Sequence, residues 1–157
     1  MTSTETRTVS HDTFVIDRTY PAAPNRVFSA FADVAAKAQW WGDPDDNDTP
    51  QEIEFRVGGR ETTVGTAPDG SVAFGYYALY QDIVQDERIV YSYDMTLDGR
   101  RISVSVATLE FLPVAGGTRL IVTEQGAYLD GLDTMEARRE GTESLMSALD
   151  TYLHTSA

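Results

Sequence analysis

Trp40-Trp41-Gly42 lies at the junction that decides the fold, between a short helical opening and a long series of strand-like segments. One amphipathic segment, Asp133 to His154, then closes the chain. This order predicts an α+β fold in which one curved antiparallel sheet wraps around one long helix. The bulky aromatic side chains at the junction are placed to wall a hollow.

The opening residues predict one strand followed by two short helices. Alternation from Asp12 to Tyr20 indicates a strand that ends at Pro21, because proline has no N–H for the ladder. Pro24 suits a first helical turn. Asp33 can cap a second short helix through Ala38, which delivers the two tryptophans.

The middle of the chain predicts a run of strands. Alternating apolar residues indicate strands over 51–57, 60–66, 72–83, 88–96, 102–112 and 118–125. Asp69-Gly70 and Asp98-Gly99 are strong hairpin signals. In 102–112 the apolar phase changes from Val104 and Val106 to Leu109 and Phe111, which predicts a β-bulge within that strand.

The closing helix predicts a cavity. Asp133 followed by Glu136 resembles a capping box at its start. Helical spacing places the following residues on the inward face: Met135, Arg138, Thr142, Leu145, Leu149 and Tyr152. The second half of this stripe is ordinary core, whereas the first half is polar or small. If that first half still faces the sheet, it faces something other than close-packed side chains, and a cavity is the natural candidate.

The length and charge fit one domain and exclude several partners. The 157 residues are expected to form a single domain over 13–157, preceded by a flexible polar segment, residues 1–12. A formal charge of −13 would repel nucleic-acid phosphates and anionic lipids. The sequence has no stretch of about 18 apolar residues and no secretory signal. We expect a cytoplasmic protein with no nucleic-acid partner and no membrane insertion.

Metal and cofactor sites are not expected. Cysteine is absent, and the two histidines, His11 and His154, lie near the ends of the sequence. The acidic loop Asp43 to Asp48 resembles a calcium loop, but Asp48 stands where that loop requires glycine. No catalytic residue is assigned. Acid–base catalysis by Glu124 or Asp82 is a hypothesis that rests on burial, which would raise the pKa of either carboxyl.

Several short motifs together resemble the START-like (SRPBCC) helix-grip superfamily, and within it the branch named after the activator of the heat shock protein 90 ATPase. The motifs are Trp40-Trp41-Gly42, Phe55-Arg56-Val57-Gly58-Gly59, Ala78 to Ile83 leading into Glu87 to Tyr91, Gly117-Thr118-Arg119-Leu120, and Gly141-Thr142 ahead of Leu145 and Leu149. The resemblance extends from about Phe14 to Leu153. It implies six or seven antiparallel strands around the C-terminal helix, with a cavity between, and no shared catalytic motif. Thr142 departs from many relatives, which place a tryptophan there.

The candidate cavity residues follow from the predicted faces. They are Phe28, Trp40, Trp41, Phe55, Phe74, Tyr76, Tyr80, Tyr91, Tyr93, Met95, Glu124, Met135, Arg138 and Thr142. Each aromatic could equally be ordinary core packing. Arg138 could anchor an anionic or carbonyl group, pair with Glu124, or be solvated.

Three functions are compatible with this sequence. The favoured one is binding of a small apolar, aromatic or lipid-like ligand in the cavity, without catalysis. The alternatives are a cyclase- or dehydratase-like enzyme acting on a polyketide-like substrate, and a chaperone ATPase cofactor-like protein with a role in stress response. Eleven arginines against one lysine suggest a GC-rich bacterial source. A homodimer is left open.

Overall fold

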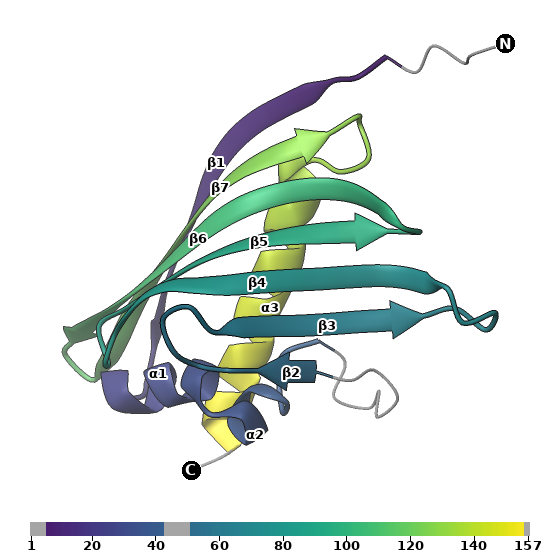
Figure 1. The fold of residues 1–157 in the computed structure, drawn as a ribbon. Helices are drawn as coiled ribbons and strands as arrows, with labels where there is room; N and C mark the ends of the chain where they lie inside the picture. Colours follow the sequence, from purple (N-terminus) through teal and green to yellow (C-terminus); the bar gives the residue numbers. More distant parts are fainter. Residues whose placement is uncertain (1–5, 43–50, 156–157) are drawn as a thin grey trace, which may run out of the picture.

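The computed structural model describes residues 6–42 and 51–155 and folds them into one sheet wrapped around one long helix (Figure 1). The sheet has seven antiparallel strands in the order β1-β7-β6-β5-β4-β3-β2. The strands are β1 (Val9–Tyr20), β2 (Gln51–Ile53), β3 (Arg60–Thr66), β4 (Val72–Val84), β5 (Arg88–Leu97), β6 (Arg100–Val114) and β7 (Gly117–Leu129). The predicted curved sheet of the helix-grip fold is therefore confirmed.

Strand β1 begins earlier than predicted. Phe14, Ile16 and Tyr20 point into the core, and the strand ends before Pro21 as expected. Its first residue is Val9, and residues 9–12 pair with β7, so assigning them to a flexible segment was wrong. The error has a simple cause, because a strand with polar residues on both faces has no alternation to detect.

Two short helices follow β1, as predicted. Helix α1 (Pro24–Ala32) has proline in its first turn and buries Val27, Phe28 and Phe31. Helix α2 (Val34–Lys37) is capped by Asp33, whose side chain accepts from the backbone N–H of Ala36 at 3.1 Å. Figure 1 shows both helices at the end of the sheet that lies near the C-terminal end of α3 (Met135–Thr155).

The two predicted hairpin turns connect β3 to β4 and β5 to β6. In the second, Asp98 and Gly99 have φ values of 51° and 79°, the left-handed pair that a tight hairpin turn requires. In the first, Gly70 has a φ of 86°. There the Asp69 carboxylate stabilises the turn by accepting from the backbone N–H of Ser71 at 2.9 Å.

The strand predicted over 51–57 ends at Ile53. Val57 is exposed, and the backbone turns back so that Glu54 N–H donates to the Arg60 carbonyl at 2.8 Å. Gly59 permits this turn, since a Cβ there would lie 2.1 Å from the Glu54 carbonyl oxygen. The apolar alternation through Phe55 and Val57 therefore comes from a turn and not from a strand.

The predicted phase change in β6 was also wrong. From Ser103 to Phe111 one set of alternate residues faces inward throughout, and the inward positions include Ser103, Ser105 and Leu109. Val104 and Val106 are exposed on the outer face. The register does shift, but near the start of the strand, where Ser103 pairs with Met95 and Arg101 with Thr96.

Helix α3 crosses the concave face of the sheet, and its start differs by one residue from the prediction. The side chain of Thr134, and not that of Asp133, caps it by accepting from the backbone N–H of Ala137 at 3.1 Å. Leu149 and Leu153 are buried core residues. Met146, which the predicted stripe omitted, is also buried.

Candidate functional site

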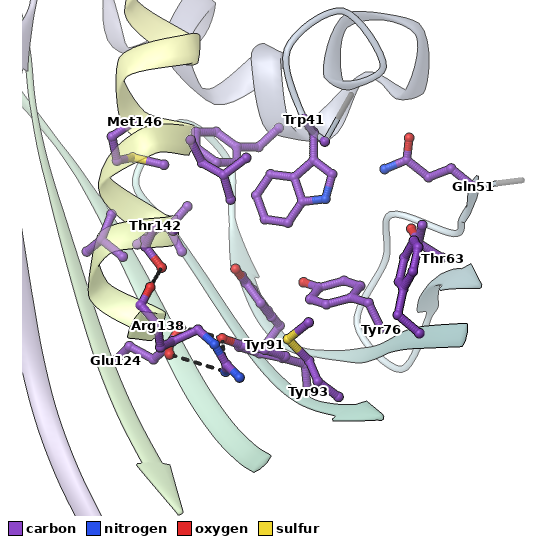
Figure 2. Close-up of a pocket in the computed structure, with 18 of the residues that line it drawn as sticks. Trp41, Gln51, Thr63, Tyr76, Tyr91, Tyr93, Glu124, Arg138, Thr142 and Met146 are labelled. Carbon is purple, nitrogen blue, oxygen red and sulfur yellow. Dashed lines mark hydrogen bonds and ion pairs between the residues drawn. The ribbon is translucent and has the colours of Figure 1, made fainter. Parts of the chain in front are cut away.

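A cavity of about 700 Å³ lies between the first half of α3 and the concave face of the sheet (Figure 2). Its walls come from α3, from strands β2 to β7, from the end of α1 and from the segment after α2. Binding pockets for small molecules typically occupy about 300–1,000 Å³. The cavity therefore has room for a ligand of that class.

Most of the predicted site residues line this cavity. They are Trp41, Phe74, Tyr76, Tyr91, Tyr93, Met95, Glu124, Arg138 and Thr142. Four of the aromatic members, Trp41, Tyr76, Tyr91 and Tyr93, form one continuous wall. Ring centroids are 5.9 Å apart for Trp41 and Tyr76, 5.1 Å for Tyr76 and Tyr93, and 5.8 Å for Tyr91 and Tyr93.

Five predicted residues, Phe28, Trp40, Phe55, Tyr80 and Met135, do not line the cavity. Phe28 packs edge-on against Phe55 in the core, with centroids 5.7 Å apart. Trp40 is buried and donates its indole N–H to a backbone carbonyl of α1 at 3.0 Å. The Tyr80 hydroxyl donates to Glu61 inside the core. Met135 is half-buried and packs against the hydrophobic core. For the four aromatic residues these positions match the core alternative that the sequence left open, whereas Met135 had been predicted only as a cavity residue.

Trp41 is positioned by a buried ion pair behind it. The ammonium group of Lys37 lies 4.1 Å from the centre of the Trp41 ring. It donates to Glu61 Oε1 at 2.6 Å, and the Tyr80 hydroxyl donates to the same oxygen at 2.6 Å. Burial lowers the pKa of Lys37, although the Glu61 charge opposes this shift. The sequence reasoning did not identify this cluster.

The α3 end of the cavity is polar, and Arg138 is at its centre. One terminal nitrogen of Arg138 donates to the Tyr93 hydroxyl at 2.9 Å and to Ser105 Oγ at 3.5 Å. The other donates to Ser103 Oγ at 2.7 Å and to the Asp133 carboxylate. Arg138 is only 9% exposed, so the solvated alternative was wrong. The two serines that complete this set are the inward residues of β6 that the apolar pattern concealed.

Glu124 faces the same cluster from β7. Its Oε1 accepts from the Tyr93 hydroxyl at 2.7 Å, and its Oε2 lies 3.9 Å from an Arg138 terminal nitrogen. Burial raises the pKa of Glu124, although the Tyr93 hydrogen bond and the Arg138 charge oppose the shift. Asp82, the other carboxylate considered, is partly exposed, does not line the cavity and pairs with Arg88 at 2.6 Å.

The opposite end of the cavity carries two polar side chains that the sequence reasoning missed. Gln51 on β2 and Thr63 on β3 are directly opposite in the ladder, and both line the cavity (Figure 2). The Gln51 amide nitrogen and the Thr63 hydroxyl are buried without a hydrogen-bond partner. Polar residues on short strands give no apolar periodicity, so no signal in the sequence could have indicated them.

The mouth of the cavity lies between α3 and the facing edge of the sheet. Ala137 and Gly141 on α3, together with Gly42 and Phe74, are exposed and yet line the cavity. Beyond Gly141 the space is open, since a Cβ there would meet no atom within 4 Å. Small side chains on this stretch of helix therefore leave the entrance wide.

Neither a metal-binding cluster nor a membrane-spanning helix is present within residues 6–42 and 51–155. No group of three or more His, Cys, Asp or Glu side chains is arranged to hold a metal ion. No helix in these ranges is long and apolar enough to span a membrane. The acidic loop Asp43 to Asp48, tested above as a calcium loop, lies outside the described residues.

The sheet gripping a long C-terminal helix, with a cavity between them, defines a START-like helix-grip protein. The chain belongs to the family described as Activator of Hsp90 ATPase homolog 1-like protein, whose model matches residues 21–154. The family resemblance read from the short motifs is thereby confirmed. No curated protein matches the chain.

Solved structures agree with this assignment. A putative uncharacterized protein from Rhizobium leguminosarum is 37% identical, with a TM-score of 0.88 over 96% of this chain and 99% of its own. A protein from Rhizobium loti is 43% identical, with a TM-score of 0.85 over 92% of this chain and 99% of its own. A protein from Chromobacterium violaceum is 23% identical, with a TM-score of 0.71 over 88% of this chain and 94% of its own, which shows the fold alone.

Proposed function

We propose that this protein binds a small, largely apolar or aromatic molecule in the cavity between α3 and the sheet. The observation that carries the proposal is a space of about 700 Å³ walled by aromatic side chains, with polar groups at its ends. Such a wall supplies apolar area to bury, and a few polar groups can fix the ligand's orientation. Tyr76, Tyr91 and Tyr93 suit this role, because each has an apolar ring and a polar tip.

A thermal-shift screen tests the proposal. Fatty acids, sterols, flavonoids and polyketide-like aromatics would be titrated against the purified protein. A ligand that binds only the native state stabilises it by about 2.7 kcal/mol at a hundredfold excess over its Kd. We expect a saturable rise in Tm that Trp41→Leu weakens, whereas Val106→Thr, on the exposed outer face, leaves it unchanged. A well-folded protein that shows no shift with any compound would contradict the proposal.

The polar cluster favours catalysis as an alternative function. Glu124 accepts from the Tyr93 hydroxyl inside the cavity, and burial raises the pKa of Glu124 toward that of a useful general acid or base. A cyclase- or dehydratase-like reaction on a polyketide-like substrate would use such a pair. Turnover that disappears in Glu124→Gln and Tyr93→Phe would support this alternative, and saturable binding without turnover would contradict it.

A further inference from the structure

One oxygen in the α3 end of the cavity has no hydrogen-bond partner. Glu124 is 3% exposed, its Oε1 accepts from Tyr93, and its Oε2 is buried with no partner. A buried acceptor left unpaired loses its hydration without compensation. A ligand group that donates a hydrogen bond at this point would restore the missing partner.

The two terminal nitrogens of Arg138 are not free to receive an anion. Each of its terminal nitrogens has two N–H bonds and two acceptors, namely Tyr93 and Ser105 on one, Ser103 and Asp133 on the other. Its single positive charge already faces the carboxylates of Asp133 and Glu124. A ligand carboxylate here would add a third negative charge without a free terminal N–H of Arg138 to bind it.

A ligand cation is also disfavoured at this end. Glu124 Oε2 lies 3.9 Å from an Arg138 terminal nitrogen, so a cation bonded to that oxygen would stand beside the guanidinium. Like charges at such a separation repel, most strongly in a buried site. The group that suits Oε2 is therefore a neutral donor such as a hydroxyl.

The far end of the cavity requires the opposite chemistry. Gln51 and Thr63 are cross-strand partners, which places their side chains on the same face of the sheet. The Gln51 amide nitrogen is buried without a partner and can only donate. The unpaired Thr63 hydroxyl beside it can also donate. An acceptor oxygen on the ligand would satisfy both groups.

The two ends are well separated. Thr63 is on β3 and Glu124 on β7, four strand positions apart in the order β7-β6-β5-β4-β3. At about 4.8 Å per strand this is roughly 19 Å along the curved sheet, and less across its concave side. Tyr76, Tyr91 and Tyr93 lie in the wall between these ends (Figure 2).

We infer that the cavity selects an elongated, neutral aromatic molecule with a hydroxyl donor at the Glu124 end and an acceptor oxygen at the Gln51 end. The inference rests on the proposed binding function and names its ligand class. It also predicts that carboxylate-bearing ligands, fatty acids included, bind poorly.

Four matched naphthalenes test the inference by titration calorimetry, below the pKa of the naphthol. The full probe is 6-hydroxy-2-acetylnaphthalene. The 6-methoxy analogue removes the donor, 6-hydroxy-2-ethylnaphthalene removes the acceptor, and 6-acetyl-2-naphthoic acid replaces the hydroxyl by a carboxylate. We expect the full probe to bind about tenfold more tightly than either neutral analogue, and the acid to bind most weakly.

Variants assign each preference to an end of the cavity. Glu124→Gln should weaken the full probe about tenfold and leave the methoxy analogue unchanged, because that analogue has no donor to lose. Gln51→Met, of similar length but without the N–H, should weaken the full probe and leave the ethyl analogue unchanged. The analogue that keeps its affinity shows that each variant is folded. Val106→Thr serves as the exposed control.

Each other outcome has a definite meaning. Equal affinities for the three neutral compounds, or tightest binding of the acid, would overturn the inference and leave the proposed binding function intact. An absence of binding by all four compounds, including the most apolar, would overturn the inference, and the thermal-shift panel then decides whether the proposed binding function fails with it. Unchanged affinities in both variants would overturn the assignment of the two ends.

Discussion

Lys37, the single lysine of the chain, is buried beside Glu61 and Tyr80. Lys37 and Tyr80 both donate to one oxygen of Glu61, Oε1, and the other oxygen of that carboxylate has no hydrogen-bond partner. A buried ion pair with an unsatisfied atom contributes little net stability, but removing one partner leaves an uncompensated charge. The cluster therefore determines how the segment carrying Trp41 is held more than how stable the fold is.

Replacing Lys37 alone should be strongly destabilising. We expect Lys37→Met to lower the free energy of unfolding by about 3–5 kcal/mol, because Glu61 would stay buried without its cation. The triple variant with Glu61→Leu and Tyr80→Phe should recover most of this loss. Urea denaturation of both variants and the parent checks the prediction. A loss below about 1 kcal/mol in the single variant would show that the site admits water.

Glu124 should make stability depend on pH in a defined direction. Burial raises the pKa of Glu124 above its ordinary value of 4.5, so the native state holds this proton more tightly than the unfolded chain does. The stability that Glu124 contributes through this proton is fully present at pH values below the ordinary pKa. It is lost as pH rises through the raised pKa of the native state.

The variant Glu124→Gln isolates this effect because it has no proton to lose. The free energy of unfolding of the variant minus that of the parent should increase as pH rises from the ordinary pKa of Glu124 to its raised native pKa. Above the native pKa this difference should become constant. Urea titrations at a series of pH values give this difference directly. A difference that is independent of pH would mean that the Glu124 carboxyl is not desolvated.

At the scale of the element, the start of α3 depends on Thr134. Its hydroxyl accepts from the Ala137 N–H, so Thr134→Ala should cost about 1 kcal/mol of stability. Thr134→Ser keeps the hydroxyl and serves as the control. Denaturant midpoints of the two variants check this, and equal midpoints would show that the cap is made elsewhere.

The same helix shows how far sequence reasoning reaches. Its existence, its length and its apolar second half followed from periodicity, because those residues pack into the core. The cap could not be placed, since Asp133 and Thr134 are both good capping residues. What distinguishes them is the ion pair between Asp133 and Arg138, a tertiary contact.

Strand β6 shows the limit for the site itself. Apolar periodicity assumes that large residues face inward, yet here Ser103 and Ser105 face inward and accept from Arg138, while Val104 and Val106 face outward. Inward polar residues that pair with a buried arginine reverse the pattern that locates a core. The aromatic wall was found because its large residues do follow the pattern, whereas the two serine partners of Arg138 were missed.

At the scale of the whole molecule, the cavity exists because the first half of α3 carries small or polar side chains. The larger side chain of a Thr142→Trp variant should occupy part of the space of about 700 Å³. We expect ligand affinity to fall at least tenfold while the Tm stays within a few degrees of the parent, since the added ring enters empty volume. Calorimetry and thermal unfolding measure the two effects. Unchanged affinity would place the ligand elsewhere.

The position of β1 in the sheet has a consequence for biosynthesis. Among residues 6–42 and 51–155 this strand pairs only with β7, and the last residue of that ladder, Leu129, lies opposite Val9. At about 5–20 residues per second, a ribosome needs on the order of ten seconds to produce the partner strand. Until then Phe14 and Ile16, which are buried in the folded protein, lie in a segment without its partner strand. The rate of translation therefore sets how long this segment can aggregate.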